Sequence, residues 1–317
     1  MIDFTVYESS GRSYGGDAGA KKGILYNGEN WFLKFPKKTA GFRNMEISYT
    51  TAPLSEYLGS QIYSLIGIDV HQTLLGRYND KLVVACKDFR KPGEDLIDFR
   101  SIKNEYNEKL EEGDLLQSSG SDTHFSSIIS IMRENAIFRA FPKLKQRFWD
   151  MFIIDALIGN NDRNNGNWGI IRNEFSKKVS IAPVFDNGAS FSGKLSNNQI
   201  SRILADDNKF VQSIYESRTC CYLDDDNRQI NPLKFLQTTE NRDCLKAIKR
   251  ILPRINAQRI CDFILSLPET EDGIVVISPE QKRFYSKTID YRYNEILLPI
   301  KTRVKELITE EPAREIE

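Results

Sequence analysis

The apolar pattern of the sequence changes once along the chain, near residue 90. Before that point, short apolar runs alternate with turn residues, and the runs that flank the Asn27-Gly28 dipeptide are a strong hairpin signal. Beyond it, segments such as 143–158 and 279–306 carry apolar residues at helical spacing. Strands followed by helices indicate an α+β fold. We therefore expect a small β-rich unit at 1–90 and a larger helical unit at 91–317.

Local patterns predict the elements of each unit. In the first unit, further strands are expected at 3–7, 68–75 and 81–86, and a helix at 53–66 with Pro53 in its first turn. In the second unit, helices are predicted at 126–140, 143–158, 244–267 and 279–306. The polar, turn-rich residues 91–123 are expected to form a surface excursion. Ligands usually bind in the cleft between two such units.

Composition excludes several classes of protein. The 44 Lys and Arg residues balance 44 Asp and Glu residues, so we expect neither direct nucleic-acid binding nor attraction to an anionic membrane. No signal-peptide pattern or membrane-spanning segment is visible, so a cytoplasmic location is expected. Five cysteines without a C-x-x-C pair and only two histidines support neither a disulfide framework nor a zinc site. The sequence does not specify an oligomeric state.

The densest chemical signal is a glycine-punctuated polar loop at 159–169 that follows an apolar helix. Its Asn and Gly residues are also typical of a helix C-terminus followed by turns. The spacing from Asp162 to Asn167, however, is the D-x-x-x-x-N spacing of a kinase catalytic loop. In such a loop, the Asp orients the attacking hydroxyl and the Asn holds a magnesium ion.

A second signal is Asp186, which follows an apolar strand and precedes Asn187-Gly188. By itself, an Asp-Asn-Gly string also predicts a hairpin turn. Together with Asp162 and Asn167, it indicates three oxygen-bearing side chains that converge on one metal ion. Mg²⁺ is the ion expected there because it prefers oxygen ligands.

A third signal lies in the first unit, where a glycine-rich segment precedes the hairpin. Backbone amides in this segment could cradle phosphates; they include those of Gly16, Asp17, Ala18 and Gly19. Lys34 on the adjoining strand could reach the same phosphates as a point charge. The string matches neither a Walker A motif nor G-x-G-x-x-G, and Lys34 could instead be a solvent-facing strand lysine.

Taken together, these strings resemble the HipA-like serine/threonine kinases, and within that family its shorter type. The similarity extends over most of the chain, from the glycine-rich segment through Leu33-Lys34-Phe35-Pro36 and Leu54-Ser55-Glu56-Tyr57 to the two polar loops. Its most specific parts are Asp162-Arg163-x-x-Gly166-Asn167-Trp168 and Pro183-Val184-Phe185-Asp186. The resemblance implies a two-lobed, protein-kinase-like fold with a small β-rich N-lobe and a larger helical C-lobe.

The resemblance also implies a role for each matching residue. Lys34 matches the lysine that contacts the ATP phosphates, and Glu56 matches the helix glutamate that pairs with it, although its helical position is also that of a solvated residue. The remaining matches are the adenine-contacting hinge (Lys87, Asp88 and Phe89), the catalytic aspartate (Asp162) and the magnesium ligands (Asn167 and Asp186). Asp150 and Asp155, on the preceding helix, are expected to be structural.

The sequence departs from the family pattern at three points. Asn164 stands where family members commonly have a histidine. The extra N-terminal subdomain of the long, toxin-type members is lacking, so antitoxin and operator association are not implied. Gly16 occupies the position of the serine that those members autophosphorylate, so any autophosphorylation is expected at Ser10 or Ser13 instead.

We therefore expect an ATP- and Mg²⁺-dependent kinase that phosphorylates a Ser or Thr hydroxyl of a protein substrate. Two alternatives fit the same scaffold. A small-molecule or lipid kinase is one, because a fold alone does not choose the acceptor. A nucleotide-binding pseudokinase is the other, although the complete set of Asp162, Asn167 and Asp186 argues against it.

Overall fold

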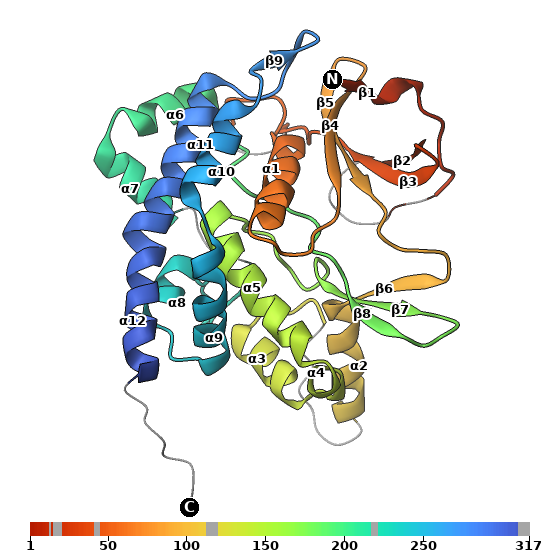
Figure 1. Ribbon diagram of the computed structural model, residues 1–317, viewed down its shortest axis with the longest axis vertical. Helices are drawn as coiled ribbons and strands as arrows, with labels where there is room; N and C mark the ends of the chain where they lie inside the picture. The colour runs from red at the N-terminus through yellow and green to blue at the C-terminus, as the bar shows by residue number, and fades with distance from the viewer. Residues whose placement is uncertain (13, 15–20, 41–44, 112–119, 217–220, 310–317) are drawn as a thin grey trace, which may run out of the picture.

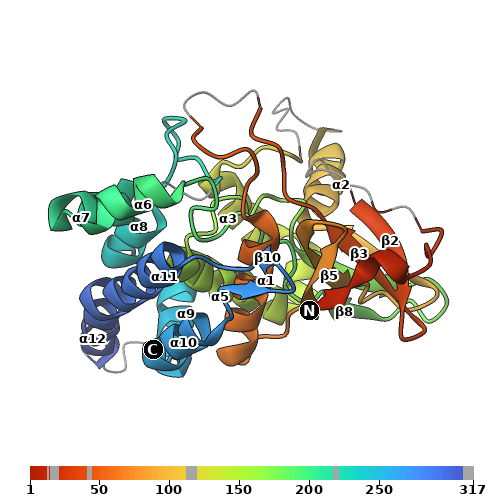
Figure 2. The ribbon, with the colours of Figure 1, turned by 90° about the horizontal axis from the view of Figure 1, so that it is seen from above.

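A computed structural model describes residues 1–317 except 13, 15–20, 41–44, 112–119, 217–220 and 310–317. It has the predicted α+β class, with a five-stranded sheet at one end and mostly helices in the remainder (Figure 1). Seen from above, the first helix, α1 (Ala52–Leu65), lies between this sheet and the helices of the C-terminal part (Figure 2). Among the described residues, no helix combines the length and apolar character needed to cross a bilayer.

The five-stranded sheet has the order β1-β4-β5-β3-β2. Its strands are β1 (Ile2–Asp3), β2 (Lys21–Tyr26), β3 (Glu29–Lys34), β4 (Thr73–Tyr78) and β5 (Lys81–Lys87), and only the β1–β4 pairing is parallel. The predicted β2–β3 hairpin is confirmed: Asn27 and Gly28 both have positive φ angles, 50° and 76°, as a tight hairpin turn requires.

Two strand predictions for this sheet were wrong in extent. The strand expected at 3–7 ends at Asp3, because the Asp3 carboxylate accepts a hydrogen bond from the Thr5 amide (3.0 Å) and starts a 3₁₀ helix, Phe4–Val6. The strand expected at 68–75 begins at Thr73. The residues before Thr73 instead contact the C-terminal part of the chain, through a bridge between Val70 and Val184.

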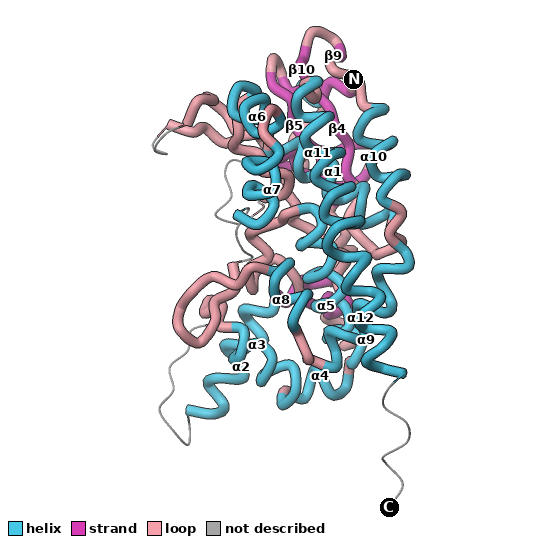
Figure 3. Tube along the Cα trace, turned by 90° about the vertical axis from the view of Figure 1, so that its left-hand side faces the viewer, coloured by secondary structure: helices cyan, strands magenta, loops and turns pink. Residues whose placement is uncertain are grey.

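The C-terminal part is built around helix α5 (Pro142–Ile158), which is buried continuously from Phe148 to Ile158. The other helices are α2 (Phe99–Glu111), α3 (Phe125–Glu134), α4 (Ala136–Ala140), α6 (Asn197–Leu204), α7 (Asp207–Glu216), α8 (Pro232–Thr238), α9 (Arg242–Ile251), α10 (Ala257–Ser266), α11 (Pro279–Tyr291) and α12 (Leu298–Thr309). Figure 3 shows α11 and α12 running along one face, joined by a π-helical stretch at Arg292–Leu297.

Two predicted helices are interrupted. The helix expected at 126–140 breaks at Asn135, whose side chain accepts a hydrogen bond from the Ile137 amide (2.8 Å) and caps α4. The helix expected at 244–267 breaks into α9 and α10 around a 3₁₀ turn, Leu252–Arg254, that contains Pro253. Proline has no amide hydrogen to continue the helical bonding.

The expected surface excursion at 91–123 was also wrong. It contains β6 (Glu94–Asp98) and α2, and β6 forms a three-stranded sheet with β7 (Gly169–Asn173) and β8 (Val179–Ile181). Phe99 at the start of α2 is buried and stacks on Trp168, with 4.4 Å between ring centroids. A further small hairpin is formed by β9 (Thr270–Glu271) and β10 (Ile274–Val275).

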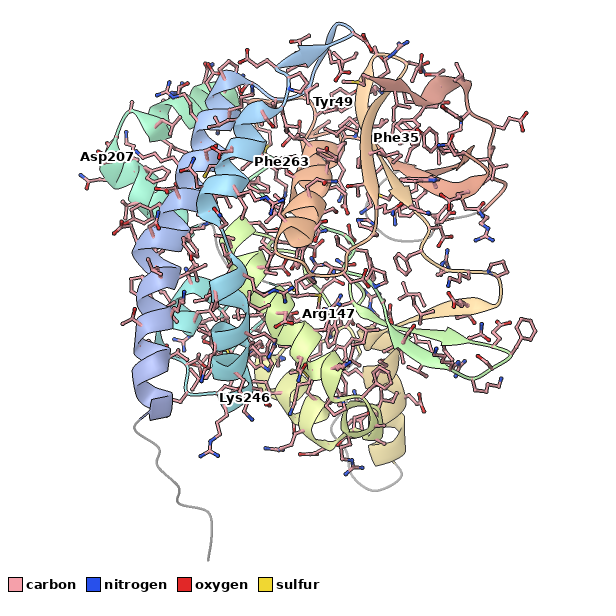
Figure 4. The ribbon with its side chains drawn as sticks, viewed as in Figure 1. Phe35, Tyr49, Arg147, Asp207, Lys246 and Phe263 are labelled. Atoms are coloured by element: carbon pink, nitrogen blue, oxygen red, sulfur yellow. The ribbon has the colours of Figure 1, made fainter. Side chains whose placement is uncertain are left out.

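Backbone hydrogen bonds join the two parts of the molecule near the start of β4. The Val184 amide donates to the Asp69 carbonyl (2.9 Å), and the His71 amide donates to the Val184 carbonyl (2.9 Å). Arg147 on α5, labelled in Figure 4, donates to the carbonyls of Asp69 (3.0 Å) and Ala182 (3.4 Å). These contacts fix the segment before Asp186 against the five-stranded sheet.

Gly169 on β7 lies opposite Asp98 on β6. A Cβ atom at this position would lie 2.8 Å from the Cα of Asp98 and closer still to the Ile97 carbonyl oxygen. Because both are backbone atoms, the strands would have to separate. We expect Gly169→Ala to lower the free energy of unfolding by about 1–3 kcal/mol, the usual cost of overpacking, as measured by urea denaturation.

The matched control is Lys178→Ala in the same hairpin, where the side chain is exposed. Surface substitutions of this kind change the free energy of unfolding by no more than about 0.5 kcal/mol. Equal unfolding midpoints for the two variants would contradict the close packing of β6 on β7.

Candidate active site

A cavity of about 630 Å³ is lined by residues of the five-stranded sheet and of the two polar loops. Aromatic side chains and cations both line it. The aromatic residues are Tyr14, Phe32, Phe89 and Phe185, and the cations are Lys21, Lys34, Lys37, Arg90 and Arg100. Flat rings suit a planar base, and several cations suit a chain of phosphates. Three of the predicted polar residues, Asp162, Asn167 and Asp186, line this cavity.

Lys34 joins the two halves of this site. Its ammonium lies 2.7 Å from a carboxylate oxygen of Glu56 on α1 and 2.7 Å from one of Asp186. Only 15% of the Lys34 side chain is exposed and none of the Glu56 side chain, so neither the solvent-facing lysine nor the solvated glutamate alternative holds. Glu56 is buried because the face of α1 that carries it packs against the loop after Asp186 instead of water.

Both partners are held in their charged forms. Burial alone would lower the pKa of Lys34, but the carboxylates of Asp186 and Glu56 outweigh this effect and raise it. Burial would likewise raise the pKa of Glu56, but the Lys34 ammonium and the His71 ring lower it well below its usual range. The Glu56 carboxylate also accepts hydrogen bonds from the Asn187 amide (3.1 Å) and lies 2.9 Å from His71 Nε2.

Glu56, His71 and Cys86 bring one potential metal ligand each within 4.8 Å of one another. Glu56 is already neutralised by Lys34. Burial and the Glu56 carboxylate raise the pKa of the Cys86 thiol well above its usual value, so this sulfur stays protonated. His71 therefore anchors Glu56, and these three residues do not form a zinc site.

The catalytic-loop candidate begins where α5 ends, at Gly159 with a φ of 69°. Asp162 is exposed at the cavity, and the loop's own side chains fix it. The Asn164 amide group donates to the Asp162 carboxylate (3.0 Å), and the Asn167 amide group donates to the Asp162 carbonyl (2.7 Å). Asn164 thus contacts the acidic group directly, at the position where family members commonly have histidine.

Arg163 connects this loop to the loop that carries Asp186. Its Nε donates to Asp155 on α5 (2.8 Å), and one of its terminal nitrogens donates to Asn187 (2.6 Å). The other terminal nitrogen contacts three carbonyls, those of Asn167 (3.2 Å), Phe185 and Asp186 (3.4 Å). Burial would lower the pKa of Arg163, but Asp155 raises it, so the charge is retained.

The Asn167 and Asp186 side chains fit an Mg²⁺ ion by their chemistry. Asn167 Oδ1 and Asp186 Oδ2 accept no hydrogen bond from a described residue, and both side chains line the cavity. A carboxylate and an amide oxygen, completed by water and phosphate oxygens, are ligands that Mg²⁺ prefers. Asp186 adopts a φ of 60°, a conformation unusual outside glycine, which Arg163 holds through the neighbouring carbonyls.

The hinge candidates differ in position. Asp88 and Phe89 line the cavity, whereas the Lys87 ammonium turns to Glu29 on β3, 2.7 Å away. The Asp88 carboxylate binds Arg90 (3.0 Å) and accepts a hydrogen bond from the Tyr14 hydroxyl (3.2 Å). Burial and Asp88 raise the pKa of Tyr14 to about 12, so its hydroxyl remains a donor.

Several predicted residues belong to the glycine-rich segment and the residues just before it. Gly16, Asp17, Ala18, Gly19 and Ser13 lie outside the described residues. Ser10 lies beside β2, where its amide donates to the Gly23 carbonyl (3.2 Å). Sequence reasoning missed the positioning roles of Arg163 and His71. The position of Arg163 next to Asp162 was a sequence signal for its role. No sequence signal indicated the role of His71.

Comparisons with known proteins identify relatives of this chain. No family model matches the chain. It is 37% identical over 307 residues to the serine/threonine-protein kinase CtkA of Helicobacter pylori, covering 96% of this chain and 89% of that protein. The crystal structure of the Helicobacter pylori proinflammatory kinase CtkA matches with a TM-score of 0.82 at 34% identity, covering 97% of this chain and 99% of that one.

A second solved structure shares the fold more distantly. It is the HipA protein of Shewanella oneidensis, in a complex with HipB and operator DNA, with a TM-score of 0.52 at 15% identity over 95% of this chain and 70% of that one. Identity above 30% over nearly the whole length identifies the family, and the HipA match adds the fold. The chain belongs to the serine/threonine-protein kinase family of CtkA.

Proposed function

We propose that this serine/threonine protein kinase transfers the γ-phosphoryl group of Mg²⁺-bound ATP to a protein hydroxyl through Asp162, Asn167, Asp186 and Lys34. The observation that carries the proposal is that these four side chains, contributed by three separate segments, line one cavity. In this assignment, residues 1–90 form the nucleotide-binding lobe and residues 91–317 the lobe that carries the catalytic and metal-binding loops. Aromatic side chains at Phe32 and Phe89 support a base-binding end to the cavity.

Each residue has a distinct part in the reaction. Asp162 is exposed at the cavity and fixed by Asn164, so it orients the acceptor hydroxyl and takes its proton. Lys34 keeps its charge and offsets charge on the phosphates. Bound at Asn167 and Asp186, Mg²⁺ would neutralise charge on the transferred group. Arg163, Asp155 and Glu56 are positioning residues that act through these groups.

The roles of Asp162 and Asp186 can be separated by binding. Asp162→Ala is expected to lower kcat by about 10²- to 10⁴-fold, the usual contribution of a positioned acid or base, and to leave Mg-ATP affinity unchanged. Asp186→Ala should abolish transfer and also weaken Mg-ATP binding, because it removes a metal ligand. Calorimetric titration with Mg-ATP, paired with a peptide phosphorylation assay, measures both effects.

A titration with ATP in EDTA provides the control for these variants. Without Mg²⁺, Asp186→Ala should bind ATP at least as tightly as wild-type protein, because the variant has one carboxylate fewer beside the phosphates and leaves the Lys34 ammonium free to contact them. If Asp162→Ala lost Mg-ATP affinity and Asp186→Ala kept it, the two assignments would have to be exchanged.

Arg163→Lys tests whether the buried guanidinium positions the catalytic loop. Lysine keeps the charge but cannot reach Asp155, Asn187 and the loop carbonyls together. We expect kcat to fall by about 10- to 100-fold, since small displacements of catalytic groups have effects of this size, with Mg-ATP affinity changed less.

The matched control is Arg250→Lys. Arg250 also binds an aspartate of α5, Asp150 at 2.5 Å, but it lines neither the cavity nor the polar loops. Its kcat should remain within about 2-fold of wild type, as for surface changes outside the site. A kcat loss of equal size in both variants would assign Arg163 a merely structural role.

A further inference from the structure

A second cavity, of about 740 Å³, meets the first at the catalytic residues. The described residues that line both cavities are Lys34, Lys37, Asp162 and Asp186. Apart from these, the second cavity has different walls: the loop at 188–195, the start of α1, and residues of α6, α7 and α11. The nucleotide site therefore opens at Asp162 into a separate space.

Phosphoryl transfer places requirements on this junction. The attacking and leaving oxygens lie roughly in line across the transferred phosphorus. The acceptor hydroxyl must therefore approach from the direction away from the nucleotide, and it must reach the Asp162 carboxylate. A cavity that meets the nucleotide cavity at Asp162 provides this approach.

The walls of the two cavities differ in chemistry. The first is rich in cations, whereas the second presents apolar side chains from several elements: Phe35, Ala52, Ala189, Leu195, Ile203 and Phe284. An apolar wall favours an apolar side chain, because contact removes both surfaces from water. Two exposed lysines, Lys37 and Lys194, also line this cavity and favour a negatively charged group.

The loop that walls the second cavity is held in an uncommon conformation. Phe191 and Ser192 have consecutive positive φ angles of 59° and 52°, which side chains rarely adopt. Hydrogen bonds keep this shape: the Phe191 amide donates to Ile158 at the end of α5 (3.0 Å), and the Gly193 carbonyl accepts from the Thr51 amide (2.9 Å). A strained conformation that the surroundings enforce is typical of functional sites.

We propose that the second cavity binds the segment of the protein substrate that carries the acceptor. The Ser or Thr hydroxyl lies at Asp162, a large apolar side chain near it packs against Leu195, Ile203 and Phe284, and an acidic residue faces Lys37 and Lys194. The kinase thus selects acceptors flanked by apolar and acidic residues. This inference rests on the proposed function, because it takes Asp162 as the residue that contacts the hydroxyl.

A positional peptide library with a fixed central serine tests the apolar contact. Wild-type enzyme should favour Leu, Ile, Met or Phe over Gly at one flanking position, by about 10-fold or more in kcat/KM. Ile203→Trp fills the cavity and should remove this preference while calorimetric Mg-ATP affinity stays unchanged. The matched control, Arg202→Trp, lies on the same helix with 71% of its side chain exposed and should keep the wild-type preference.

Lys194→Glu tests the preference for acidic residues, and unlike Ile203→Trp it does not fill the cavity. It should shift the library from acidic toward basic residues by about 2- to 5-fold, the range of an exposed ion pair. Lys209→Glu is the control, because Lys209 is exposed on α7 and does not line the cavity. Urea denaturation of every variant identifies any that fail to fold.

The possible outcomes distinguish failure of the proposed substrate site from failure of the proposed kinase function. A library phosphorylated without flanking preference, or a preference that Ile203→Trp and Lys194→Glu both leave unchanged, would overturn the substrate site and leave the kinase assignment intact. A wild-type enzyme that binds Mg-ATP but labels only a lipid or sugar would overturn both.

Discussion

The Arg163 guanidinium is almost completely buried, so its charge must be compensated inside the protein. Asp155 supplies the compensating charge, and Tyr63 and Asn160 donate further hydrogen bonds to the same carboxylate (2.8 and 3.1 Å). The remaining donors of Arg163 contact both polar loops. One buried ion pair thereby fixes the end of α5, the loop of Asp162 and the loop of Asp186 relative to one another. Removing either partner of such a pair would leave an uncompensated buried charge. The relative positions of the three segments therefore depend on this ion pair.

A second ion-pair network, centred on Lys34, extends this arrangement across the molecule. Lys34 is on the five-stranded sheet, Glu56 is on α1, and Asp186 belongs to the C-terminal part. The His71 ring contacts the Glu56 carboxylate, and the His71 amide donates a hydrogen bond to the Val184 carbonyl, two residues before Asp186. A displacement of the sheet relative to the helices would therefore break contacts at Lys34 and at His71 together. This coupling explains why Glu56 is buried although it lies outside the apolar stripe of α1.

Sequence reasoning succeeded where the signal is local. The Asn27-Gly28 turn sets its hairpin within a few residues, and the spacing of Asp162 and Asn167 lies in one loop. It failed where the deciding partner is remote. β6 pairs with β7, which follows four intervening helices in the chain and is absent from any window around residue 94. Glu56 is the corresponding case in the site, since its burial follows from Lys34, His71 and Asn187. Pro253, by contrast, is a local helix-breaking signal. The helical periodicity on both sides of it led us to predict one continuous helix at 244–267.

The junction of the two cavities carries an excess of negative charge. Glu56, Asp162 and Asp186 supply three carboxylates there against two ammonium groups, and one of these, Lys34, pairs with Glu56 and Asp186. Such an excess attracts a divalent cation, but it would repel the phosphates of a nucleotide that arrived without one. The same field would repel an acidic residue placed beside the acceptor hydroxyl. Acidic residues of a substrate are therefore accommodated beside the Lys37 and Lys194 ammonium groups, while the space next to Asp162 is left to the hydroxyl and its apolar neighbour.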